Sequence, residues 1–154
     1  MKKNQKNGIL GIICIFMLIF FTFSYMQEKS YKKSDLMNKE WVNRIPGKTA
    51  HASYSYTDKE ITLKVFYNGV KIDQELVIPY YLSDDIVDKF HADSVGNNKS
   101  GKYIVRLSKI KVGETYEEHI ELFEILELTD TFLKTKHVRS GTVLEFHVEE
   151  SENQ

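Results

Sequence analysis

Two groups of residues in this 154-residue chain could carry out chemistry: five histidines and a run of glutamates. A zinc site needs three or four convergent ligands, usually with one close pair on a single element. No two histidines have such a spacing, so the sequence predicts no metal site and no cofactor, and they are interpreted as structural. They are His51, His91, His119, His137 and His147.

The glutamates could be paired carboxylates for acid–base work. A general acid needs burial to raise its pKa, and side chains within so acidic a run are expected to stay in water. We interpret them as the solvated face of one long strand or helix. They are Glu117, Glu118, Glu121, Glu124 and Glu127.

Nucleophilic catalysis is not indicated either. A serine hydrolase typically places its nucleophile in a Gly-x-Ser-x-Gly turn, and neither "NNKSGK" (97–102) nor "RSGT" (139–142) has that pattern. Both segments are predicted to be hairpin turns. The stretch 91–102 also lacks the acidic spacing of a calcium loop. The chain is therefore expected not to be an enzyme.

The elements that would position these residues are mostly strands. In "EITLKVFYNGVKI" (60–72), apolar and polar residues alternate on both sides of Asn68-Gly69, which is typical of a tight hairpin turn. Pro79 is expected to break a strand, because proline has no N–H to donate to a ladder. For 117–128 a helix is an alternative to the preferred strand. Predicted strands cover 40–45, 51–57, 60–68, 70–78, 80–83, 86–91, 102–109, 118–127, 131–137 and 142–149.

Many short strands without alternating long helices indicate an all-β protein, an antiparallel sandwich or barrel. Residues 25–154 carry 18 basic and 22 acidic side chains. This balance does not favour nucleic acid, whose phosphates need a basic surface. No cysteine follows Cys14, so a hydrophobic core must stabilise the domain without disulfides.

The N-terminus predicts export. The uncharged run 7–27 follows Lys2, Lys3 and Lys6, and a helix of that length spans roughly 32 Å, close to the apolar thickness of a bilayer. It is either a membrane anchor or a cleaved signal peptide, so the protein is expected to be membrane-anchored facing the periplasm or cell exterior, or secreted. Residues 28–36 are predicted to be a linker, and a domain follows from Met37.

Several short segments resemble the small lipocalin-like domains of exported bacterial proteins. The matching residues are Leu36, Trp41, Tyr80-Tyr81-Leu82-Ser83, Val95-Gly96, Ser100-Gly101-Lys102-Tyr103-Ile104-Val105, Ile125-Leu126-Glu127-Leu128-Thr129 and Leu133. Two features depart from the family: Lys39 replaces the usual glycine before Trp41, and the lipoprotein cysteine has no counterpart. The resemblance implies an eight-stranded up-and-down barrel, or a partly open version of it, over 37–150, followed by a tail at 151–154.

Two functions are expected for such a barrel. The first is the binding of a small hydrophobic or amphipathic ligand by inward-facing side chains. The second is a structural or protein-interaction module with a filled core and an exposed apolar patch near Pro79-Tyr80-Tyr81-Leu82; its protein partner is not identified by the sequence. The inward-facing candidates are Trp41, Tyr54, Tyr56, Leu63, Val65, Tyr103, Val105, Leu107, Leu144 and Phe146.

Overall fold

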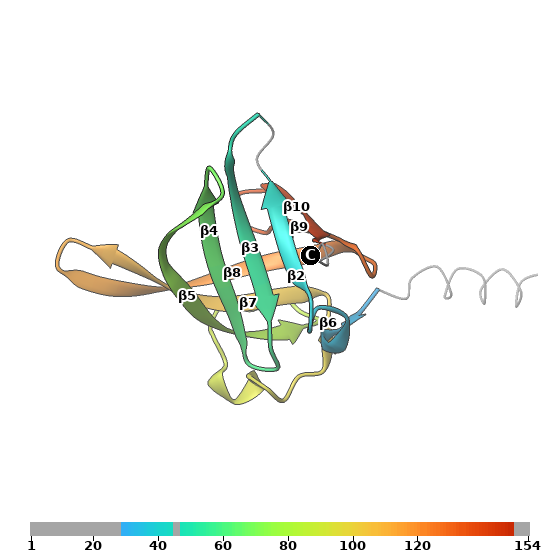
Figure 1. The fold of residues 1–154 in the computed structure, drawn as a ribbon. Helices are drawn as coiled ribbons and strands as arrows, with labels where there is room; N and C mark the ends of the chain where they lie inside the picture. Colours follow the sequence, from blue (N-terminus) through green and yellow to red (C-terminus); the bar gives the residue numbers. More distant parts are fainter. Residues whose placement is uncertain (1–28, 45–46, 150–154) are drawn as a thin grey trace, which may run out of the picture.

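The structure is a computed structural model that describes residues 29–44 and 47–149. Eight antiparallel strands form a closed barrel in the order β10-β2-β3-β4-β5-β7-β8-β9 (Figure 1). The barrel strands are β2 (Glu40–Arg44), β3 (Ala50–Tyr56), β4 (Glu60–Tyr67), β5 (Val70–Ser83), β7 (Tyr103–Val112), β8 (Thr115–Leu128), β9 (Phe132–His137) and β10 (Val143–Val148). The expected all-β antiparallel barrel is confirmed.

The apolar run 7–27 and the tail 151–154 lie outside the described residues. Within the described ranges, no helix is long and apolar enough to cross a membrane.

The hairpin expected at Asn68-Gly69 is present, and both residues have positive φ angles, 52° and 76°. A two-residue turn of this kind matches the right-handed twist of the flanking strands, so it fixes the pairing of β4 with β5. The segment 117–128 lies within strand β8, and the helical alternative does not apply.

Two predictions about the strands are wrong: one predicted strand is absent, and one predicted break does not occur. Residues 86–91 form bends and irregular backbone rather than a strand. Pro79 does not end a strand but lies inside β5, opposite Glu60 of β4. The proline is tolerated because the N–H of Tyr80 donates to Lys59 O on the β4 side, and successive residues of a strand face opposite edges. The missing N–H of Pro79 therefore faces β7, at the point where pairing with that strand stops.

The predicted linker 28–36 differs from the expectation. Its described residues form strand β1 (Tyr31–Lys32), paired with β6 (Ser100–Gly101), and the 3-10 helix η1 (Lys33–Asp35). Residues 31–37, which we call the cover segment, pack across one end of the barrel. Leu36 is buried there, and its carbonyl oxygen accepts a hydrogen bond of 2.8 Å from Trp41 Nε1.

The contacts of Lys33 show how the polar cover segment can pack against the end of the barrel. Its side chain is buried, its Nζ donates to Asp58 O at 2.9 Å, and the Asp58 carboxylate lies 3.6 Å away. Burial lowers the pKa of Lys33, although the Asp58 charge acts in the opposite direction. A buried lysine is tolerated where it is paired and hydrogen-bonded.

Candidate functional site

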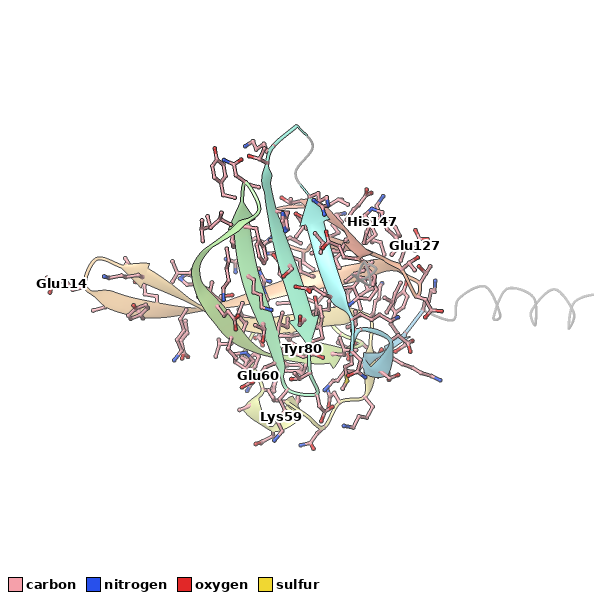
Figure 2. All side chains as sticks on the ribbon, viewed as in Figure 1. Lys59, Glu60, Tyr80, Glu114, Glu127 and His147 are labelled. Carbon is pink, nitrogen blue, oxygen red and sulfur yellow. The ribbon has the colours of Figure 1, made fainter. Side chains whose placement is uncertain are left out.

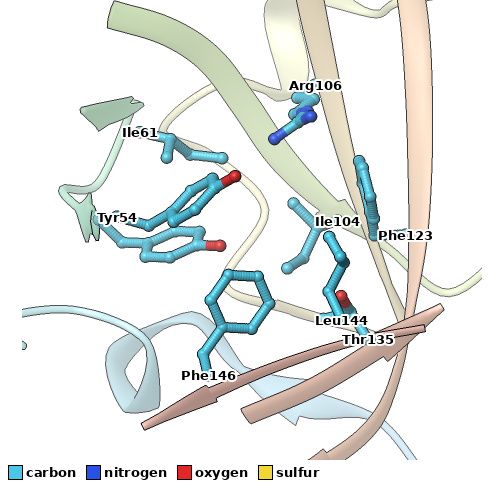
Figure 3. Close-up of a pocket in the computed structure, with 9 residues that line it drawn as sticks. Tyr54, Ile61, Ile104, Arg106, Phe123, Thr135, Leu144 and Phe146 are labelled. Carbon is cyan, nitrogen blue, oxygen red and sulfur yellow. The ribbon is translucent and has the colours of Figure 1, made fainter. Parts of the chain in front are cut away.

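The interior of the barrel is filled by side chains. Tyr54 packs edge to face on Phe146 with ring centroids 5.1 Å apart, and Tyr56 packs similarly on Tyr80 at 5.4 Å. A cavity among these rings, lined by residues that the structure describes, has a volume of about 10 Å³, room for about one water molecule. Figure 3 shows its lining, which consists of Tyr54, Tyr56, Ile61, Ile104, Arg106, Phe123, Thr135, Leu144 and Phe146.

Five of the ten candidate residues take part in this interior packing. Trp41, Tyr56 and Phe146 belong to the buried core, and Tyr54 and Leu144 pack against it. Val65 lies nearer the Asn68-Gly69 turn on β4, where it is half-buried and opposite Ile72.

The face predicted for β7 is wrong by one residue. Tyr80 and Leu82 lie opposite Arg106 and Ile104, and directly opposed residues share a face of the sheet. Because Tyr80 and Leu82 point into the core, Ile104 and Arg106 do so as well. Tyr103, Val105 and Leu107 therefore project from the other face of β7. Val105 is buried there, opposite Tyr81, whose ring contacts Phe90.

The alternative patch near residues 79–82 is also wrong, because Tyr80, Tyr81 and Leu82 are buried. Tyr80 donates its hydroxyl hydrogen to Thr57 O at 2.8 Å. Among the described residues, eight of the twelve exposed large apolar side chains lie instead on the two hairpins β4–β5 and β7–β8, which diverge from each other in Figure 1.

The hairpins diverge because β5 and β7 are paired only from Tyr80 to Ser83. On the N-terminal side of Pro79, β5 pairs only with β4 among the described strands. In the same region β7 pairs with β8 as far as Val112. We call the stretch between residues 70–79 of β5 and 107–112 of β7 the seam. Figure 2 shows how far the β7–β8 hairpin projects: Glu114, in its turn, lies well away from Tyr80.

The seam contains a cavity of about 350 Å³, within the size range of ligand pockets. Of the ten candidate residues, only Leu63 and Leu107 line it. The full lining is Leu63, Leu76, Val77, Ile78, Pro79, Arg106, Leu107, Ser108, Lys109, Ile110 and Glu121. Its walls are mainly aliphatic, and polar side chains are grouped on β7 and β8.

Arg106, Ser108 and Glu121 form the polar group. Arg106 Nε donates to Glu121 Oε2 at 2.8 Å, and the Ser108 hydroxyl donates to the same oxygen. Burial favours the neutral form of Glu121, but the two hydrogen bonds and the Arg106 charge together outweigh it and lower the pKa of this carboxyl. The group thus holds an ionised pair between the packed interior and the seam, with the Arg106 guanidinium 4.4 Å from the ring centre of Phe123.

Apolar side chains continue outward from the cavity along both edges. Leu76 is 55% exposed, Val77 56% and Ile110 47%. Exposed large apolar residues on these hairpins are Tyr67, Val70, Ile72, Leu76, Val77, Ile110, Val112 and Tyr116. Leu76, Val77 and Ile110 come together in the lining of the cavity, and exposed apolar side chains gathered in one place are typical of interaction sites.

The histidines occupy separate places. His51 stacks on Phe66 at 4.7 Å between ring centres, and His137 and His147 pack on Phe123 and Phe132. Among the described residues, no group of three or more histidine, cysteine or acidic side chains could hold a metal ion.

Comparison of the chain with protein-family models, curated proteins and solved structures finds no match. The fold and the geometry of the seam therefore carry the functional argument.

Most of the seam was not predicted from the sequence. Arg106 and Ser108 lie on the face of β7 that was expected to point outward, and Leu76 and Ile110 were not among the candidates. One signal was present in the sequence. In "YIVRLSKIKV" (103–112), apolar residues occur at both odd and even positions, so either face of this strand could point inward.

Proposed function

We propose that this chain is an exported, non-catalytic, lipocalin-like barrel that works as a protein-interaction module, with the seam as its binding surface. The observation that carries the proposal is the contrast between the packed part of the interior, where a cavity of only about 10 Å³ is found, and the seam at the open end, with a cavity of about 350 Å³. A barrel of eight strands can be filled by side chains alone. The exposed apolar edges of the seam then offer a surface able to bury area on binding.

Export rests on the apolar run 7–27 and the lysines before it. In this proposal the run, whether retained as an anchor or cleaved, delivers the barrel to the outer side of the membrane. The lipocalin-like assignment rests on the eight-stranded up-and-down order and on the short sequence segments that resemble that family.

A second candidate function is supported by the seam cavity itself. A small amphipathic molecule could place its apolar part against Leu63, Leu76 and Ile78, with its polar part toward Arg106. Pockets that are mostly apolar with a few polar groups are typical of small-molecule sites. In this case the ligand lies at the open end of the barrel, against inward-facing side chains of β4, β5 and β7.

One experiment separates the two functions. The full-length chain carries a photoreactive amino acid in its producing cell, either at Val77 in the seam or at Val143 on β10, which is an exposed apolar control. Crosslinking to another polypeptide from position 77 but not from 143 supports the interaction module. Native mass spectrometry of the same full-length protein, extracted in mild detergent, reports any bound small molecule.

A bound species of defined mass that is lost in Leu76→Asp, without a polypeptide crosslink, favours the small-molecule function. Crosslinks of equal strength from both positions, or no crosslink and no bound species, would contradict the assignment of the seam as the binding surface.

A further inference from the structure

The backbone of β7 has an open edge in the seam. Tyr80 directs its N–H to β4, so the N–H of Tyr81 faces β7, and that of Val105, directly opposite, faces β5. Pairing of β7 with β8 is in continuous register from Tyr103 to Val112. By alternation, the N–H groups of Leu107, Lys109 and Lys111 therefore point into the seam, where the described part of β5 does not pair with them.

The two faces of this edge differ in chemistry. Ser108, Ile110 and Val112 share the inner face with Arg106, while Lys109 and Lys111 lie on the outer face. Ile110 and Val112 are each 47% exposed. A segment that paired with this edge would place apolar side chains on the inner face and meet two ammonium groups on the outer face.

The charges on the outer face favour an acidic partner. Lys109 has one acidic neighbour, Glu118, at 3.5 Å. Lys111 lies opposite Tyr116, and no ion pair joins it to the described part of the chain. Opposite charges on directly facing residues of neighbouring strands stabilise pairing, and like charges destabilise it.

A second copy of β7 does not fit the edge. In a symmetric antiparallel pair, facing residues come from the same face of each strand, so registers centred on Lys109, Ile110 or Lys111 place lysine opposite lysine. Lysines on edge strands commonly prevent such self-pairing. The same lysines would select a foreign strand with acidic side chains.

We propose that the seam edge of β7, residues 107–112, is a strand-addition site for an extended segment of another protein in which acidic and apolar residues alternate. The segment pairs antiparallel with β7, its apolar side chains cover Ile110 and Val112, and its acidic side chains face Lys109 and Lys111. In this recognition mode, backbone hydrogen bonds supply affinity and alternate side chains supply specificity. The inference rests on the proposed function and names the chemistry of the partner.

The test uses the full-length chain in neutral detergent and a labelled, capped peptide, Glu-Val-Glu-Val-Glu-Val. Controls are Lys-Val-Lys-Val-Lys-Val and a block peptide, Glu-Glu-Glu-Val-Val-Val. Fluorescence anisotropy is expected to show binding of the alternating acidic peptide about tenfold or more tighter than either control. Amide exchange measured by NMR is expected to slow at Leu107, Lys109 and Lys111.

Charge reversal provides the matched variants. K109E/K111E is expected to invert the preference toward the basic peptide. K134E/K136E carries the same charge change at the same spacing on β9, which is paired on both sides, and is expected to leave the preference unchanged. NMR spectra of both variants check that the barrel remains folded.

Equal affinity for all three peptides, no alternating protection on β7, or an unchanged preference in K109E/K111E would overturn the inference. If position 77 still crosslinks a polypeptide in cells, the proposed function stands and only the strand-addition mode fails. If position 77 captures no polypeptide, the interaction module fails with it.

Discussion

At one end of the barrel, β5 and β7 are paired from Tyr80 to Ser83 and the cover segment lies across the opening. At the other end the same two strands separate and leave a cavity of about 350 Å³. The closed end buries Trp41, Tyr80 and Leu82 completely, whereas the open end leaves Leu76 and Ile110 about half exposed. One sheet thus supplies both a stabilising core and an open surface, and the division falls at Pro79.

The largest expected effect is at the closed end. Trp41→Ala removes a fully buried ring and its hydrogen bond to Leu36, and should lower the free energy of unfolding by about 3–5 kcal/mol. Chemical denaturation followed by circular dichroism measures this loss. A loss below about 1 kcal/mol would show that the closed end is not the main source of stability.

Gly101→Ala tests how tightly the closed end is packed. An added Cβ would lie 2.5 Å from the backbone nitrogen of Ser83, so β5 or β6 must shift. Overpacking of this kind is expected to cost about 1–3 kcal/mol. The control Gly113→Ala adds its methyl group in open space at the β7–β8 turn, where φ is 65°; any loss there reports backbone strain alone. Equal losses in the two variants would mean that the close approach to Ser83 is not limiting.

Glu121→Gln tests the boundary between the two ends. The folded-state pKa of Glu121 is below its ordinary value of 4.5, so the unfolded chain binds more protons between these two values. The stabilisation by Glu121 is therefore present above pH 4.5 and is lost as the pH falls through the folded-state pKa. We expect a loss of about 1–2 kcal/mol at pH 7, which shrinks on acidification. Denaturation at pH 7 and pH 3 measures it; a pH-independent difference would contradict this assignment.

Substitutions at the open end should have the smallest effect on stability. Leu76→Ser and Ile110→Thr change half-exposed side chains on strand edges, and each is expected to change the free energy of unfolding by about 0.5 kcal/mol or less. Both should nevertheless weaken crosslinking from position 77. Thermal denaturation and crosslinking yield, measured on the same preparations, compare the two effects. A large loss of stability would mean that the seam belongs to the core.

The strands were predictable where apolar and polar residues alternate strictly, so that only every second residue is apolar. In 60–72 the alternation and the Asn68-Gly69 turn are enough to identify β4, the start of β5 and their pairing from the sequence alone. In β7 apolar residues occur at both odd and even positions, so the sequence pattern alone does not show which face points inward. The choice is made by the partners: Arg106 points inward because the Glu121 carboxylate, which also accepts a hydrogen bond from Ser108, pairs with it there.

Two other features depend on contacts distant in sequence. The polar stretch around Lys33 has the composition of a linker, and its burial depends on Asp58. The seam depends on the length over which β5 and β7 pair, which the alternation along either strand does not encode. Pro79 was recognised as incompatible with a two-sided ladder, and this is the point where pairing on one side ends.

The cover segment also determines how the barrel bears mechanical load. Among the described residues, tension on the chain from its N-terminal side reaches first the hydrogen bond from Ser30 to Asp84 and then β1, which pairs with only two residues of β6. Next in line are the Lys33 contacts with Asp58 and the bond from Trp41 to Leu36. Each detached residue lengthens the free chain by roughly 3.5 Å, and these contacts must break one after another before tension acts on β2 at Glu40. A barrel held at its N-terminus would thus lose its cover under force while β5 and β7, and the seam between them, keep their shape.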